Sequence, residues 1–224
     1  MKAILEGLKT FQTTVYERHR ELFERLRTKQ DPQVLFITCA DSRVVPNLIV
    51  QAEPGDLFTV RNAGNIVPPR GQGPGGVSAS IEYAVEALGV RDIILCGHSN
   101  CGAMRAILHP ETVAALPNMA AWVRHAEPAR KAVERLYPGA QEEELMERMV
   151  EQNVIQQVKN LLTHEWIAER VRAGRLDIHG WVYDIGTGRV RGLDESGEGF
   201  CETAADAPGS PEEKLMLFEL ENPG

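Results

Sequence analysis

Three short, almost continuously apolar runs in the first half of the chain restrict its fold more than any other feature. They cover residues 34–37, 56–60 and 93–96. Runs without polar–apolar alternation are typical of strands buried on both faces of a parallel sheet. Residues 77–88, between the second and third runs, have helical periodicity and end at Gly89, a favourable helix stop. The sequence therefore predicts an α/β fold with a central, mostly parallel sheet of order 2-1-3-4.

The remainder of the chain is predicted to flank this sheet with helices and to add an edge strand. Residues 117–173 read as helical with a break near Pro138-Gly139, and residues 142–172 form one long helix in this interpretation. Residues 177–184 and 188–192 read as strand, turn and strand at the sheet edge. We find no repeat or low-complexity linker, so we expect a single domain over residues 1–224.

The two ends of the chain are predicted to lie outside this core. Residues 2–29 carry apolar positions at helical spacing with charges between them, which predicts an amphipathic helix or a pair of helices. Asp31-Pro32 stops it, because proline cannot continue a helix. We therefore expect a helical arm over residues 1–30. Residues 194–224 are acidic and rich in Gly and Pro, and we expect a loose tail.

Composition excludes several classes of function. The chain has 224 residues, 43% hydrophobic and 25% charged, with a formal net charge of -8. An acidic chain of this kind lacks the basic face that a nucleic-acid partner needs. No apolar run approaches the roughly 18 residues of a membrane span. The N-terminal stretch has no secretory pattern, so a cytoplasmic protein with reduced cysteines is expected.

Two segments that follow predicted strands carry the chemically informative residues. Cys39-Ala40-Asp41-Ser42-Arg43 follows the first apolar run, and Gly97-His98-Ser99-Asn100-Cys101-Gly102 follows the third. In a doubly wound sheet the first and third strands are neighbours, and the functional crevice opens beyond their carboxyl ends. The topology therefore predicts that both segments meet in one pocket.

Such a pocket contains two thiols and an imidazole. Cys39, His98 and Cys101 form a three-ligand set that suits zinc and leaves a fourth position for water or substrate. Cys96 lies inside a predicted strand, where a buried cysteine is ordinary. Each of these residues alone is more often a core or hydrogen-bonded residue than a ligand, and only their convergence favours an open catalytic metal site.

Asp41 and Arg43 lie two residues apart and can form a bidentate ion pair. Asp41 is also two residues from Cys39, close enough to reach the metal itself. We therefore hypothesise a pH-sensitive gate, in which Asp41 is a fourth ligand when the site is closed and pairs with Arg43 when it is open. An ordinary surface pair of little energetic value is the alternative.

These residues together resemble the β-class carbonic anhydrases. The family carries a Cys-x-Asp-x-Arg motif, matched by Cys39, Asp41 and Arg43, and a following His-x-x-Cys, matched by His98 and Cys101. The intervening GDLFTVRNAGNIVPP and SIEYAVEALGV are similar too. The resemblance runs from about residue 30 to residue 184, and it is nearest to cyanobacterial-type members of the plant-like branch.

The resemblance implies reversible hydration of carbon dioxide to bicarbonate at Zn²⁺ bound by the three ligands, with Asp41 and Arg43 as catalytic residues. It implies a substrate pocket at a dimer interface, with the N-terminal helix wrapped over the partner in a homodimer or dimer of dimers. The residues expected to bind substrate are Gln30 (from the partner subunit), Phe58, Ala63, Tyr83 and the backbone N–H of Gly102.

Other readings stay open at this point. Relatives that hydrolyse carbon disulfide or carbonyl sulfide share the motif, and a non-catalytic zinc scaffold would also keep the ligands. The cyanobacterial resemblance also suggests carboxysome components as partners, although those members often carry longer C-terminal extensions.

Overall fold

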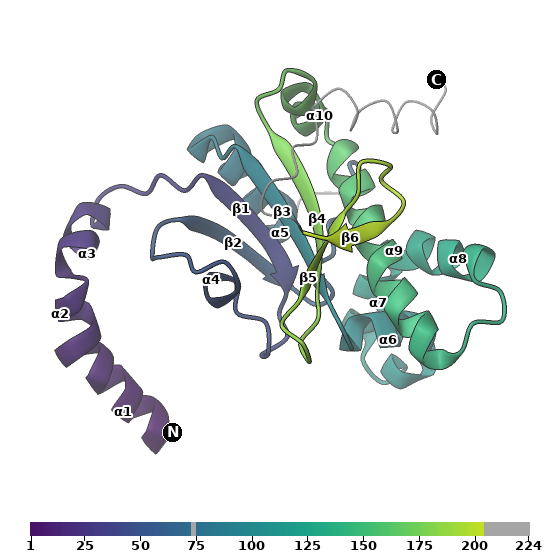
Figure 1. Cartoon of the computed structure of the whole chain (residues 1–224), viewed down its shortest axis with the longest axis horizontal. Helices are drawn as coiled ribbons and strands as arrows, with labels where there is room; N and C mark the ends of the chain where they lie inside the picture. Colours follow the sequence, from purple (N-terminus) through teal and green to yellow (C-terminus); the bar gives the residue numbers. More distant parts are fainter. Residues whose placement is uncertain (73–74, 204–224) are drawn as a thin grey trace.

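The computed structural model describes residues 1–72 and 75–203, and its centre is a single six-stranded sheet (Figure 1). The strands are β1 (Val34–Cys39), β2 (Leu57–Asn62), β3 (Asp92–His98), β4 (Asp177–Tyr183), β5 (Val190–Leu193) and β6 (Phe200–Glu202). Their spatial order is β2-β1-β3-β4-β5-β6. The first four strands pair in parallel, β5 pairs antiparallel with β4, and β6 pairs antiparallel with β5. The predicted α/β class, strand order and edge strand are confirmed.

β1 and β3 lie inside the sheet, and apolar residues cover both of their faces. Leu35 and Ile37 of β1 face the large core, whereas Phe36 faces a smaller cluster on the opposite side of the sheet with Ile94 and Trp181. This burial on both faces explains why the two strands read as unbroken apolar runs.

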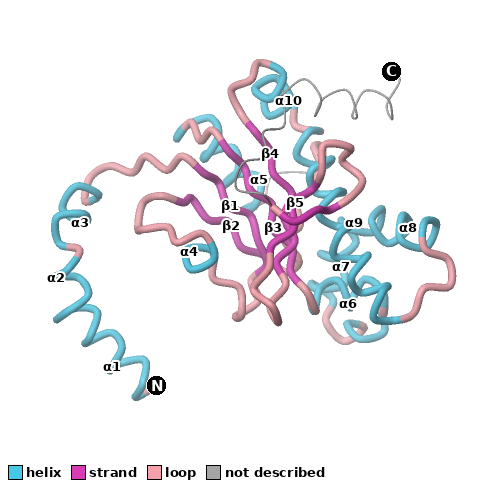
Figure 2. The backbone as a smooth tube through the Cα atoms, in the orientation of Figure 1, coloured by secondary structure: helices cyan, strands magenta, loops and turns pink. Residues whose placement is uncertain are grey.

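Helices gather mainly over one face and one end of the sheet (Figure 2). They are α4 (Pro46–Ile49), α5 (Gly76–Glu82), α6 (Gly102–Leu108), α7 (Pro117–Val123), α8 (Glu127–Leu136), α9 (Glu142–Leu162) and α10 (Glu165–Arg172). A π-helical segment, Tyr83–Leu88, continues α5 and ends at Gly89, whose φ of 70° is readily adopted by glycine.

α9 packs closely on the sheet because two strand positions carry glycine. A Cβ at Gly97 of β3 or at Gly180 of β4 would come within 2.9 Å of a Val154 methyl group. The absence of both side chains lets Val154 fit between the two strands.

The prediction of a single long helix over residues 142–172 is wrong in one respect, because the helix is interrupted between α9 and α10. His164 has extended backbone angles there. The Thr163 hydroxyl donates to the Asn160 carbonyl and accepts the Arg70 N–H, and His164 Nε2 lies 3.1 Å from the Pro68 carbonyl oxygen. Tertiary contacts with the loop at 68–70 thus override helical periodicity.

The N-terminal residues form consecutive helical segments that extend away from the sheet (Figure 1). These are α1 (Lys2–Thr10), a π-helical segment (Phe11–Val15), α2 (Tyr16–Arg18) and α3 (Arg20–Leu26). None of their residues is buried within the chain. Leu26 contacts the body of the protein beside Gly55. The helical arm expected at the N-terminus is therefore present and largely unpacked.

The C-terminal segment is more ordered at its start than the sequence suggests. β6, within the segment expected to be a loose tail, pairs with β5 through three residues on each strand. The rest of the predicted tail, from residue 204 on, lies outside the described residues. Among the described helices, none is both long and apolar enough to cross a membrane.

Candidate metal centre

The structure brings Cys39, His98 and Cys101 together at the carboxyl ends of neighbouring strands. Cys39 is the last residue of β1, His98 is the last of β3, and Cys101 immediately precedes α6. Their ligand atoms all lie within 4.8 Å of one another, and the two Sγ atoms are 3.9 Å apart. The three residues are 6%, 0% and 1% exposed, so the cluster is enclosed by the chain's own core.

The turn between His98 and Cys101 orients the imidazole. Asn100 has a φ of 53°, a left-handed conformation that asparagine adopts more readily than most residues. His98 Nδ1 lies 2.9 Å from the Ser99 carbonyl oxygen, which accepts a hydrogen bond when Nδ1 is protonated. Nε2 then faces the cluster as an acceptor, and it finds no hydrogen-bond partner among the described residues. An unpaired buried nitrogen is costly, and a metal ion would satisfy it.

The two thiols of the cluster, Cys39 and Cys101, differ in pKa. The hydrogen bond from Cys101 lowers the pKa of Cys39 to about 4 against the opposing effect of burial, and the Gly64 N–H, 3.3 Å from Cys39 Sγ, contributes in the same direction. The bond with Cys39, together with burial, raises the pKa of Cys101. Cys39 is therefore the thiol of the pair that ionises first. By contrast, burial raises the pKa of Cys96 to about 12, as expected for a core cysteine.

Asp41 and Arg43 form the predicted bidentate pair beside this cluster. Arg43 Nε donates to Asp41 Oδ1 at 2.9 Å, and Arg43 Nη2 donates to Oδ2 at 2.7 Å. Arg43 Nη2 also donates to the Asn100 carbonyl. The hydrogen bonds from Arg43 hold the pKa of Asp41 well below its usual range. Asp41 Oδ2 lies 3.8 Å from His98 Nε2, so the carboxylate borders the space between the three candidate ligands.

A residue that sequence reasoning missed, Arg61, holds the loop that follows Cys39. Its Nε donates to the Cys39 carbonyl at 3.1 Å and its Nη2 donates to the Asp41 carbonyl at 2.7 Å. Arg61 lies in β2 opposite Thr38 of β1. A charged residue near the end of a strand beside the ligand-bearing strand was the only signal for it in the sequence.

The residues predicted to bind substrate fall into two groups. Phe58 and Tyr83 approach each other, with ring centroids 6.0 Å apart, although Tyr83 remains 49% exposed. Ala63 follows β2, and its carbonyl accepts a hydrogen bond from the indole of Trp122. Gly102 begins α6, where the first N–H groups lack partners within the helix.

Gln30 lies apart from the other predicted residues. It is exposed in the connection between α3 and β1, before the amino end of β1, whereas Cys39 closes the carboxyl end. At roughly 3.3 Å per residue, β1 alone separates these ends by about 16 Å. Gln30 therefore does not reach the metal cluster of its own chain.

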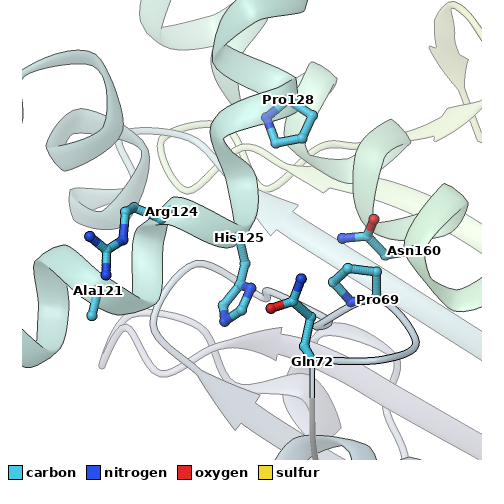
Figure 3. A pocket seen from close by; sticks show the side chains of 7 residues that line it. All are labelled: Pro69, Gln72, Ala121, Arg124, His125, Pro128 and Asn160. Carbon is cyan, nitrogen blue, oxygen red and sulfur yellow. The ribbon is translucent and has the colours of Figure 1, made fainter.

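A surface hollow of about 410 Å³ lies away from this cluster (Figure 3). Its lining consists of Pro69, Gln72, Ala121, Arg124, His125, Pro128 and Asn160. None of the candidate ligands or predicted substrate residues belongs to it.

Comparisons with known proteins agree with one another. The family model "Carbonic anhydrase" matches residues 34–190. A carbonic anhydrase of Pseudomonas aeruginosa is 50% identical over 204 residues, which cover 91% of this chain and 92% of the relative. A carbonic anhydrase of the cyanobacterium Synechococcus elongatus is 41% identical over 220 residues, covering 96% and 81%. The solved structure of the beta-carbonic anhydrase CcaA aligns with a TM-score of 0.88 and 44% identity over 92% of both chains.

Proposed function

The chain belongs to the β-class carbonic anhydrases, which interconvert carbon dioxide and bicarbonate, and we propose that its reaction takes place at a zinc ion held by Cys39, His98 and Cys101. The resemblance found in the sequence, including the similarity to cyanobacterial members, agrees with these relatives. The observation that carries the zinc assignment is the buried set of two thiols and one imidazole nitrogen without another partner.

The donor set supports zinc over other metals. Thiolate and imidazole are zinc's preferred ligands, and three protein ligands leave the fourth tetrahedral position open, as in catalytic zinc sites. A hard cation such as Mg²⁺ or Ca²⁺ would require oxygen ligands, and Asp41 is the one carboxylate that the described residues are seen to place beside the cluster. A zinc ion bound by these three residues would lower the pKa of a coordinated water and so make hydroxide available near neutral pH.

Asp41 and Arg43 orient the reactants in this proposal. The Asp41 carboxylate borders the open position and stays ionised through the neutral range because Arg43 lowers its pKa. It can accept a hydrogen bond from the attacking group and direct a lone pair at carbon dioxide. Arg43 fixes the carboxylate and is itself tied to the Asn100 carbonyl. The pH-sensitive gate stays a prediction, which structures at low and high pH with identical Asp41 positions would contradict.

The substrate pocket is proposed to need a second copy of the chain. Phe58, Ala63 and Tyr83 provide an apolar wall suited to a small nonpolar gas, and the Gly102 N–H can stabilise the negative charge that develops on oxygen. Gln30 is too far from its own cluster, so it is assigned to the site of a partner subunit. A homodimer or a dimer of dimers follows from this assignment.

Stopped-flow carbon dioxide hydration across pH, with wild type beside Asp41→Ala, tests this function. We expect the wild-type rate to rise with pH, and Asp41→Ala to retain zinc while its highest rate falls by about 10²-fold, since an orienting acceptor is lost. Wild type with full zinc and no hydration at high pH would identify a non-catalytic zinc protein. Faster turnover of carbonyl sulfide or carbon disulfide would identify a hydrolase.

A cytoplasmic location, expected from the first residues and the scattered cysteines, and association with carboxysome components, suggested by the cyanobacterial resemblance, are further proposals. Fractionation of cells that form carboxysomes, with this protein tagged, distinguishes the two locations.

A further inference from the structure

One loop, residues 63–70, contacts the candidate metal centre through the backbone of Gly64. The Gly64 N–H donates to Cys39 Sγ at 3.3 Å. Gly64 has a φ of 82°, which favours glycine. A Cβ there would lie 2.8 Å from Ala103 Cβ and 2.9 Å from Met104 Cε, so the peptide sits flush against α6.

The same glycine is held from its carbonyl side by α9. Asn153 Nδ2 donates to the Gly64 carbonyl at 3.0 Å, across 89 residues of sequence. Asn153 is 1% exposed, so this amide has been taken out of water entirely. Its Oδ1 accepts the Gln157 Nε2–H at 2.9 Å, which leaves Nδ2 directed at Gly64.

Two more buried amides extend this row along α9 and hold the loop further on. Gln157 Oε1 accepts the Val67 N–H at 2.9 Å, and Asn160 Nδ2 donates to the Val67 carbonyl at 2.8 Å. Gln157 and Asn160 are 0% and 4% exposed. Apolar side chains could fill this part of the core, but a buried polar row stabilises one conformation of a loop that lacks regular structure.

We propose that Asn153 is a positioning residue of the metal centre, which fixes the Gly64 peptide so that its N–H donates to the Cys39 sulfur. The inference rests on the proposed zinc site and extends it to α9, from which no ligand comes. Asn153 acts at the ligand through one peptide, whereas Asn160 holds Val67, three residues farther along. Their effects on the metal should therefore differ although both are buried amides on one helix.

Purified full-length Asn153→Ala and Asn160→Ala proteins test the proposal. We expect Asn153→Ala to release zinc to an excess of chelator about tenfold faster than wild type, as is typical when an outer partner of a ligand is lost. We expect the amide proton of Gly64 to exchange with solvent about tenfold faster in the same variant. Asn160→Ala should lower the melting temperature comparably and leave both rates within about twofold of wild type.

Equal rates of zinc release in the two variants would overturn the proposal and leave Asn153 a purely structural residue. If Asn153→Ala does not fold, Asn153→Leu keeps a similar volume without the donor and answers the same question. Wild type that purifies without zinc would contradict the proposed function instead. In that case the Gly64 exchange rate still reports whether Asn153 fixes the peptide beside Cys39.

Discussion

The metal-ligand cluster and the N-terminal helices differ in how much of their surface the chain buries by itself. Cys39, His98 and Cys101 are nearly inaccessible, whereas Ile4 and Leu5 of α1 are 70% and 56% exposed. Cys39 and His98 end strands that the core already orders, and Cys101 directly precedes α6. The helices of the arm present apolar side chains that the rest of the chain does not cover.

This difference indicates which part of the site is complete within one chain. All three proposed metal ligands come from one chain, whereas Gln30 follows the arm and lies far from the cluster of its own chain. Covering the arm's apolar residues would gain about 25 cal/mol for each Å² removed from water. Association of two copies can therefore supply both the cover for these apolar residues and Gln30, which is proposed to bind substrate.

Cys101→Ala gives the largest expected effect, because it removes one of the three proposed metal ligands, all of which come from a single chain. The variant should bind less than a tenth of the wild-type zinc, and hydration should fall to the uncatalysed background. Zinc is measured by elemental analysis and hydration by stopped flow. Cys201→Ser, at an exposed cysteine in β6, is the control and should keep both. One tightly bound zinc per chain in Cys101→Ala would refute the ligand assignment.

Charges on the N-terminal helices should disrupt the proposed association of two chains. In Leu8→Glu/Phe11→Glu, two exposed apolar residues become acidic, and we expect the assembly to dissociate to single chains that retain zinc. Hydration should fall by about 10³-fold, since the partner's Gln30 and its cover over the substrate wall are lost together. Analytical ultracentrifugation and zinc analysis are the measurements, with Glu6→Lys as a control. Dissociated chains with full activity would show that one chain suffices.

Gln30→Ala removes the one substrate-binding residue that is proposed to come from the partner subunit. The assembly and its zinc should persist while hydration falls by about 10²-fold, the usual cost of removing one oriented donor. Mixing Gln30→Ala chains with Cys101→Ala chains should then restore part of the activity, because a mixed dimer contains one site with both functional residues. No recovery in verified mixed dimers would place Gln30 in the site of its own chain.

The smallest effect is expected at an exposed ion pair of the body. Arg170 donates to both carboxylate oxygens of Glu86 and lowers the pKa of Glu86. Glu86→Gln should lower the melting temperature by at most about 2 °C at neutral pH, because exposed pairs contribute little. The ion pair stabilises the folded chain at pH values above the ordinary pKa of glutamate. This contribution is lost as the pH falls through the lowered pKa of Glu86 in the folded chain. The two proteins should therefore melt alike in acid, and a difference that persists there would exclude the ion pair as its cause.

Sequence reasoning was strongest where local patterns coincide with topology. The apolar runs located β1 and β3, and strand order then placed Cys39 beside His98 without any contact information. It failed where tertiary contacts decide the local structure. The helix break at His164 depends on the loop at 68–70, and Arg61 donates to the carbonyl groups of Cys39 and Asp41 at and beyond the end of another strand. No periodicity encodes such partners, because they are separated by tens of residues.

The close fit of α9 on the sheet has a consequence for the metal centre. Val154 fills the space left by Gly97 and Gly180, and its neighbour in the chain is Asn153. A single added methyl group at either glycine would push the helix outward and carry the Asn153 amide with it. Substitutions at these two glycines are therefore expected to change how firmly the Gly64 peptide is held against Cys39, although none of the proposed metal ligands is replaced.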